Sequence, residues 1–291
     1  MAVEVPAVKV VEGIPGRARS ETIKKLVAYG LLIAIALVYF VPFFWSVSTS
    51  LKTLPETAHF SLLPHHPTLS AFRDVLGKYN FLRYAANTAF LATMTTLFNL
   101  VLASLGGYAF ARLRFPGREV LFMLVLGTLM IPSPLRLVPV FQMLTSWHLV
   151  GTYRGLILIN LVTAQNLFFM RQYFITIPRD FEEAAKLDGA GYLKTFWRVM
   201  LPLAGPALAA VTILQFQSTW NEFFWPVILL GFGDPDRYTL TLGISQFVFQ
   251  YQTLWPQLMA ASVIGILPIA LIFVIFQRYF IAGVVAAGVK G

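Results

Sequence analysis

The sequence predicts an all-α integral membrane protein with six transmembrane helices. Of its 291 residues, 57% are hydrophobic and only 12% are charged, whereas a soluble domain carries about a quarter charged residues. The hydrophobic residues gather in stretches of about 20, the length that an α-helix needs to cross a hydrocarbon core of roughly 30 Å. The sequence contains no cysteine, which excludes disulfides, thiolate metal sites and cysteine nucleophiles.

Six hydrophobic stretches are long enough to cross a membrane. The first follows a polar, basic segment without a convincing cleavage site, so we expect it to stay as a span. The third contains Pro132, Pro134 and Pro139. Because proline breaks the helical hydrogen-bond ladder, we expect a kink or break near the outer end of that helix. The six stretches lie at 26–47, 85–111, 119–144, 153–175, 203–230 and 255–277.

The distribution of lysine and arginine predicts that both termini are cytoplasmic. An even number of spans places the two ends on one side, and most of the 22 lysine and arginine residues fall on that side. The net charge of +9 then reflects cytoplasmic loops against a lipid bilayer, and we expect no nucleic-acid partner. The predicted organisation is a cytoplasmic tail at 1–25, a transmembrane domain at 26–280 and a cytoplasmic tail at 281–291.

A polar elbow interrupts the apolar pattern at 178–202. Asp180 is placed to cap a short helix, and Glu183 three residues later completes a capping box. Gly189 is placed to end that helix in the left-handed conformation. A second amphipathic piece then presents four apolar residues on one side: Leu193, Phe196, Trp197 and Met200. From the residues alone, the elbow is either a docking surface or an interfacial loop that joins two spans.

The elbow contains the stretch "EAAKLDGAGYLKTFWRVMLP". It resembles the EAA loop of ABC importer permeases at Glu183, Ala184, Ala185, Gly189, Val199, Leu201 and Pro202, with valine where isoleucine is commonest. In that family the loop forms a coupling helix that docks into a cleft on a separate ATP-hydrolysing subunit. The resemblance therefore implies that the residues for coupling to the ATPase are Glu182, Glu183, Ala184, Ala185, Asp188, Gly189 and Ala190.

Four further segments resemble the carbohydrate-uptake, maltose-type branch of that family, and most of all its smaller permease subunit. They are "NTAFLAT" from Asn87, "YAFARLRFPG" from Tyr108, "WNEFFWPVIL" from Trp220 and the terminal "GVVAAGVKG". The resemblance implies a bacterial-type cytoplasmic membrane, a sugar-type solute and three partners. These partners are a second homologous permease, a dimer of ABC ATPases and an extracytoplasmic solute-binding protein. In that family the terminal segment reaches toward the ATPase interface.

The sequence lacks the Gly-x-x-x-x-Gly-Lys-Ser/Thr motif that cradles nucleotide phosphates. We therefore expect no enzyme activity and no cofactor in this chain, with ATP and Mg bound by the partner ATPase. An intramembrane enzyme would need a nucleophile with a base, and a channel would need charges along a span. Neither pattern is present, and a structural membrane subunit would not need the elbow. The histidines, at 59, 65, 66 and 148, lack metal-ligand spacing.

Polar residues inside the predicted spans are candidates for the solute path. A charge at the bilayer centre costs about 2.5–3.5 kcal/mol, so such residues should face a cavity or a partner. Amides would hydrogen-bond a hydroxyl-rich solute and aromatic rings would stack on sugar faces. The alternative is a helix–helix contact, which we favour for Asn99. The candidates for the path are Gln165, Asn166, Gln217, Trp220, Asn221 and Glu222.

The identity of the solute is left open by the sequence. Maltodextrin, trehalose, another oligosaccharide and a polyol all fit the resemblance. Arg136 and Arg154 near the outer mouth keep glycerol 3-phosphate as an alternative, although arginine at a membrane boundary is usually an anchor.

Overall fold

The computed structural model describes residues 15–248 and 253–288, and this part of the chain is nearly all helical. One isolated antiparallel bridge joins Val248 to Thr253, and the described residues contain no strand. The prediction that the terminal "GVVAAGVKG" reaches toward the ATPase interface falls on side chains outside the described residues, as does the tail at 1–14. The three longest helices are α1 (Pro15–Ser50), α3 (Phe81–Arg112) and α14 (Trp255–Gly288).

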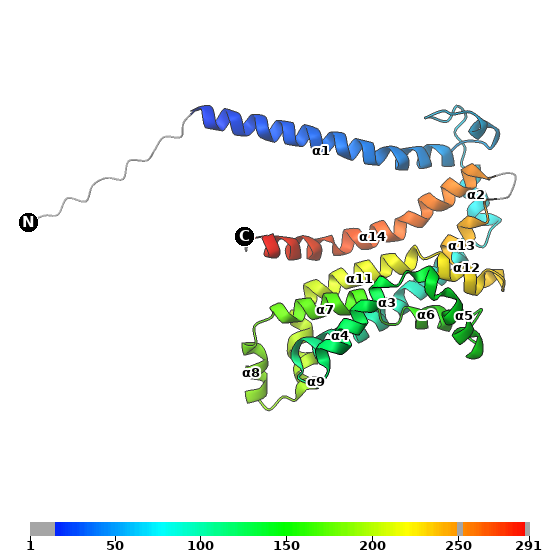
Figure 1. Cartoon of the computed structure of the whole chain (residues 1–291). Coiled ribbons are helices and arrows are strands. Elements are labelled where there is room, and N and C mark those ends of the chain that lie inside the picture. Colours follow the sequence, from blue (N-terminus) through cyan, green and yellow to red (C-terminus); the bar gives the residue numbers. More distant parts are fainter. Residues whose placement is uncertain (1–14, 249–252, 289–291) are drawn as a thin grey trace, which may run out of the picture.

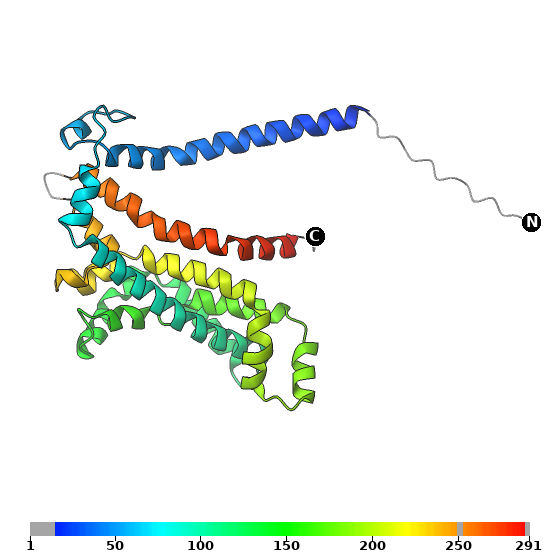
Figure 2. The same ribbon diagram turned by 180° about the vertical axis from the view of Figure 1, so that it is seen from behind.

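The centre of the molecule is a bundle in which α3 lies against α7 (Ala164–Thr176) and α11 (Gly205–Trp220) (Figure 1). Its core is made of small and large apolar side chains that fit between close helices, as at Gly107, where an added Cβ would lie 2.7 Å from Met170. Helix α14 packs on α11, and α1 packs on α14 outside the bundle (Figure 2). The apolar residues of α1 are therefore mostly exposed.

Three described helices are long and apolar enough to cross a membrane by themselves, at Lys24–Ser50, Phe81–Arg112 and Trp255–Ile275. Two bent pairs raise this number to five. The first pair, Arg118–Met130 with Ser133–Ser146, bends by 103°. It contains α4 (Arg118–Gly127), η2 (Thr128–Met130), η3 (Ser133–Arg136) and α5 (Leu137–Ser146). The break at Pro132 confirms that the prolines interrupt the third stretch, but it lies near the middle of 119–144 and not near one end as predicted.

The fourth predicted stretch, 153–175, is not one continuous helix. It divides into α6 (Tyr153–Ile159) and α7, with a break at 160–163. Thr163 restarts the helix because its hydroxyl oxygen accepts a hydrogen bond from the backbone N–H of Asn166 at 3.4 Å. This is an N-cap, and it satisfies one of the amides that every helix start leaves unpaired.

The fifth predicted stretch, 203–230, is also interrupted, and this corrects the position of Glu222. Helix α11 ends at Trp220 and α12 (Phe224–Leu230) begins after a short gap. Glu222 lies in that gap, where its carboxylate accepts hydrogen bonds from the N–H groups of Phe224 at 3.0 Å and Trp225 at 3.4 Å. Its charge therefore faces the positive end of a helix dipole instead of standing inside a span.

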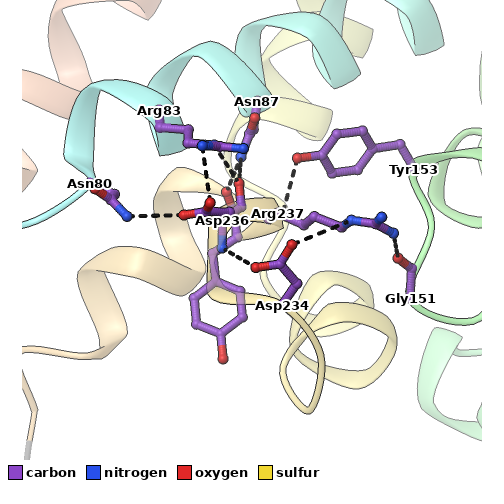
Figure 3. Close-up of polar contacts among 9 residues, drawn as sticks. Asn80, Arg83, Asn87, Gly151, Tyr153, Asp234, Asp236 and Arg237 are labelled. Carbon is purple, nitrogen blue, oxygen red and sulfur yellow. Dashed lines mark hydrogen bonds and ion pairs between the residues drawn. The ribbon is translucent and has the colours of Figure 1, made fainter.

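A polar clip holds the elements at the end opposite the elbow (Figure 3). Asp236, in η5 (Pro235–Arg237), lies 3.0 Å from the Arg83 guanidinium, and its side chain accepts a hydrogen bond from Asn80 at 3.1 Å. Arg237 donates to the carbonyl oxygen of Gly151 at 2.8 Å, and Tyr153 donates to that of Arg237. The clip fastens the loop after α12 to the start of α3 and of α6.

The remaining short elements lie at the two ends of the bundle. Near the clip are η1 (Pro55–Ala58), α2 (Ser70–Gly77) and α13 (Leu240–Ser245). At the other end are α8 (Asp180–Leu187), α9 (Tyr192–Thr195), the π-helical turn η4 (Phe196–Met200) and α10 (Leu201–Leu203). Helix α8 lies at the same end as the beginning of α1 and the end of α14 (Figures 1 and 2).

Candidate functional site

Helix α8 forms where the polar elbow was predicted, but the predicted capping box is wrong. The helix already includes Asp180, and no side chain caps its first residue. The N–H groups of Glu182 and Glu183 instead donate to the carbonyl oxygen of Arg179, at 2.9 and 3.0 Å. The three acidic residues of the first turn and Lys186 in the last turn still match the helix dipole.

The end of α8 is a Schellman motif, as the position of Gly189 predicted. Gly189 has φ +73°, a left-handed conformation that costs a residue with a Cβ about 1–2 kcal/mol. Its N–H donates to the carbonyl oxygen of Lys186 at 3.0 Å, and that of Ala190 donates to Ala185 at 2.9 Å. The two bonds satisfy carbonyls at the end of the helix and turn the chain sharply into α9.

Arg112 fixes the base of α8 to the bundle. This residue ends α3, and its side chain is only 6% exposed. Its guanidinium lies 3.7 Å from the carboxylate of Glu182, which is itself largely buried. The same guanidinium donates to the carbonyl oxygens of Phe174, at 2.6 Å, and Ile177. One buried cation thus joins the ends of α3 and α7 to the first turn of α8.

An aromatic cluster lies beneath this cation and joins α3, α7 and η4. The ring of Tyr108 packs against Phe174 and Phe196, with ring centroids 5.8 and 5.3 Å apart. Phe196 and Met200 are fully buried, but Leu193 and Trp197 are 65% and 46% exposed. The sequence predicted only that these four residues lie on one side of the second piece, and the structure buries two of them and leaves the other two exposed. Phe196 and Met200 pack into the core, whereas Leu193 and Trp197 face outward.

The predicted coupling residues divide between the outer surface of α8 and its inner face. Glu183, Ala184, Asp188 and Gly189 are exposed, whereas Glu182 and Ala185 are buried. Leu187, near the turn, is 91% exposed. On one side of α8, a hollow of roughly 620 Å³ is lined by Asp180, Phe181, Ala184, Ala185, Asp188 and Ala190 together with residues that follow the turn.

The predicted path residues also divide into two groups. The Asn166 side chain is 4% exposed and donates to the side-chain oxygens of Asn99 and Gln215, both at 2.8 Å. Trp220 is 3% exposed and donates to the carbonyl oxygen of Gly265 in α14 at 3.1 Å. By contrast, Gln165, Gln217 and Asn221 are exposed. Glu222 is half-buried in the helix break already described.

Arg112 and Gln215 contact the predicted site residues Glu182 and Asn166, although the sequence did not single them out for a site. Both are buried and both bridge helices. Their only sequence signal is the residue type itself: a basic residue at the end of a span, and an amide inside one. Among the described residues, no three histidine, cysteine or carboxylate side chains come together as metal ligands.

The chain matches the family model of binding-protein-dependent transport system inner membrane components over residues 99–285. It is 35% identical to the arabinooligosaccharides transport system permease protein AraQ of Bacillus subtilis, over 88% of this chain and 92% of that protein. It is 31% identical to the trehalose/maltose transport system permease protein MalG of Thermococcus litoralis, over 94% of this chain and 99% of that protein.

The fold is similar to a chain in the crystal structure of a bacterial ABC transporter that imports the acidic polysaccharide alginate. The TM-score is 0.78 at 29% identity, and the match covers 90% of this chain and 98% of that chain. The chain belongs to the family of binding-protein-dependent transport system inner membrane components, and it is a permease subunit of an ABC importer, as its EAA-like elbow and its apolar helices indicated.

Proposed function

We propose that this permease crosses the cytoplasmic membrane six times, with both termini and α8 on the cytoplasmic side, and carries a sugar-type solute. It forms half of the path, and a second, homologous permease forms the other half. The names of the relatives support the class of solute, since they transport arabinooligosaccharides and trehalose or maltose. A solute-binding protein delivers the solute to the face that carries the clip around Asp236.

Helix α8 couples the permease to a dimer of ABC ATPases, which bind the ATP and Mg. The observation that carries this proposal is the contrast between the two faces of α8. Its inner face is fixed to α3 and α7 through Glu182, whereas Leu187 is 91% exposed beyond the bundle. An exposed leucine of this size on a polar surface fits insertion into a cleft on a partner protein.

The solute path uses the exposed polar residues of the bundle. Gln165, on α7, and Gln217, near the end of α11, are free of the interhelical contacts that occupy Asn166 and Trp220. Asn221 follows directly after α11 and is also exposed. Amide groups in these positions can hydrogen-bond a hydroxyl-rich solute without breaking the bundle.

The absence of cysteine makes the proposal directly testable, because a single introduced cysteine is the only thiol in the chain. Leu187→Cys places it on α8, and Phe232→Cys places it at a 98% exposed position after α12. In intact cells, we expect a membrane-impermeant maleimide to label the second variant only. A thiol-reactive cross-linker should join the first variant, and not the second, to the ATPase subunit.

Three results would each overturn a different part of the proposal. Labelling of Leu187→Cys from outside the cell would reverse the orientation. Cross-linking of the ATPase to both variants or to neither would remove α8 as its contact. Solute uptake by the purified chain without any ATPase would contradict the coupling to ATP hydrolysis.

A further inference from the structure

A basic hollow lies beside α8, on the side opposite the hollow lined by Ala184. It is formed between α8 and the loop that joins α3 to α4, and a second, more open hollow continues from it along that loop. We call the two together the basic hollow. Its polar lining carries a net positive charge. Three carboxylates, Glu182 and Glu183 in the inner part and Glu119 in the outer part, stand against five basic side chains: Arg112, Arg114, Arg118, Arg179 and Lys186.

Three of these cations, Arg114, Arg179 and Lys186, have no carboxylate partner among the described residues, and the Lys186 ammonium lies over the ring of Tyr192. Arg112 is engaged by Glu182, and Arg118 lies 2.7 Å from Glu119. Arg114 and Arg179 are exposed, line both parts of the hollow and take part in no ion pair of the described chain. The planar guanidinium presents two parallel N–H donors, a geometry that fits phosphate oxygens.

The basic hollow continues into an apolar surface. Its outer part includes Phe115 and Val120, and the loop turns at Gly117, which has φ +76°. Helix α4 then exposes Val120, Leu121, Met123 and Leu124, at 58%, 48%, 60% and 65%. In the proposed topology the loop lies at the cytoplasmic surface and α4 enters the hydrocarbon. Cations at the surface followed by an exposed apolar helix match the two halves of a phospholipid.

We propose that the basic hollow binds the phosphate headgroup of an anionic phospholipid of the cytoplasmic leaflet, with the acyl chains along α4. The assignment to the cytoplasmic leaflet rests on the proposed orientation of the chain. The binding site itself does not depend on the proposed transport function. Arg114 and Arg179 hold the phosphate from the loop and from the start of α8. Because Arg179 also supplies the carbonyl that begins α8, the bound lipid contacts the base of the elbow.

The test measures lipid retention by the purified full chain together with the subunits that co-purify with it. Native mass spectrometry in phosphatidylcholine, with added phosphatidylglycerol, counts the anionic lipids retained. Each cation near an anionic surface contributes about fivefold to affinity, so we expect R114Q/R179Q to bind phosphatidylglycerol about 25-fold less tightly. The control K24Q/K25Q removes the same charge from exposed positions of α1 and should retain the lipid.

Three results would overturn the proposal. They are unchanged affinity in R114Q/R179Q, equal retention of phosphatidylglycerol and phosphatidylcholine by the wild type, and displacement of the lipid by an equal concentration of inorganic phosphate. The last result would identify a site for a free anion. The proposal is also wrong if R114Q/R179Q no longer co-purifies with the ATPase subunit but still retains phosphatidylglycerol. That result would identify the hollow as a contact with the ATPase.

A charge-preserving variant, R114K/R179K, separates folding from binding, because it should keep both the assembly and most of the lipid affinity. The wild-type comparison of the two lipids needs no variant at all. Retained lipid in a complex that imports no sugar would contradict the proposed function and leave this site standing.

Discussion

Arg112 and Glu182 form a buried ion pair whose atoms lie 3.7 Å apart, with side chains 6% and 11% exposed. The two residues are 70 positions apart in the sequence. Their ion pair joins the elbow to the bundle. A buried pair of this kind adds little over a well-packed apolar pair, but removing one partner leaves the other charge buried and uncompensated. The cost of such a removal is about 3–5 kcal/mol.

We therefore predict that Arg112→Gln strongly destabilises the permease. It removes the cation beside Glu182 and the charged donor to the carbonyl oxygens of Phe174 and Ile177. The melting temperature should fall by about 6 °C or more. Lys78→Gln is the matched control, because Lys78 pairs with Asp74 but is 73% exposed. An exposed pair contributes about 0–1 kcal/mol. Equal losses in the two variants would contradict the role of Arg112.

Gly189→Val should uncouple transport from ATP hydrolysis. No atom lies within 4 Å of a Cβ at this position, so the cost comes only from the positive φ, about 1–2 kcal/mol. Gly191→Val is the matched control, since Gly191 also has open space but φ −73°. Gly189→Asn should restore coupling, because asparagine tolerates the left-handed region. Solute-stimulated ATPase activity is the measurement, and loss in both valine variants would point to crowding at the partner surface.

Asn166→Ala should lower stability without changing solute preference. The substitution removes two hydrogen bonds, to Asn99 and Gln215, in a buried interhelical network. Interhelical hydrogen bonds contribute about 0.6–2 kcal/mol each, enough to shift melting but not to prevent insertion. Gln165→Ala, at the exposed neighbouring position, should change solute preference without lowering stability. Uptake of competing sugars and thermal melting, measured on both variants, separate the roles. Altered preference in Asn166→Ala would place that amide in the path.

Asp74 should make stability depend on pH in the acid range. Its hydrogen bond to Lys78 lowers the pKa of the carboxyl group below the ordinary value of 3.8, and Gln257 of α14 acts in the same direction. A lowered pKa means that the folded state favours the ionised form. This stabilisation is present above the unfolded pKa and is lost as pH falls through the folded pKa. The melting temperature of the wild type should therefore fall at pH values below about 4, and Asp74→Asn should remove the contribution of this carboxyl group to that fall. The same dependence of melting temperature on pH in the variant and the wild type would contradict the prediction.

The elbow was predictable because its signals are local. A cluster of acids, a lysine four residues after Glu182 and a glycine at 189 are enough to delimit a short helix and its left-handed end. The proline break near Pro132 is local in the same sense. These features depend on neighbours along the chain, so they can be recognised without knowing the fold.

Other features depend on which helices meet. Hydropathy placed Glu222 inside a span because it counts apolar neighbours and cannot detect a hydrogen bond to a later helix start. Periodicity identified Leu193 and Trp197 as apolar but could not tell that the chain itself covers only Phe196 and Met200. The roles of Arg112 and Asn166 likewise follow from contacts between α3, α7 and the elements around them, which no single stretch of sequence contains.

The aromatic cluster of Tyr108, Phe174 and Phe196 has a mechanical consequence. A close-packed interior has low compressibility and transmits strain. The contacts between the base of α8 and the long helices are three packed rings and one buried guanidinium. We therefore expect a force applied at Leu187 to shift and rotate α3 and α7 instead of being absorbed within the cluster.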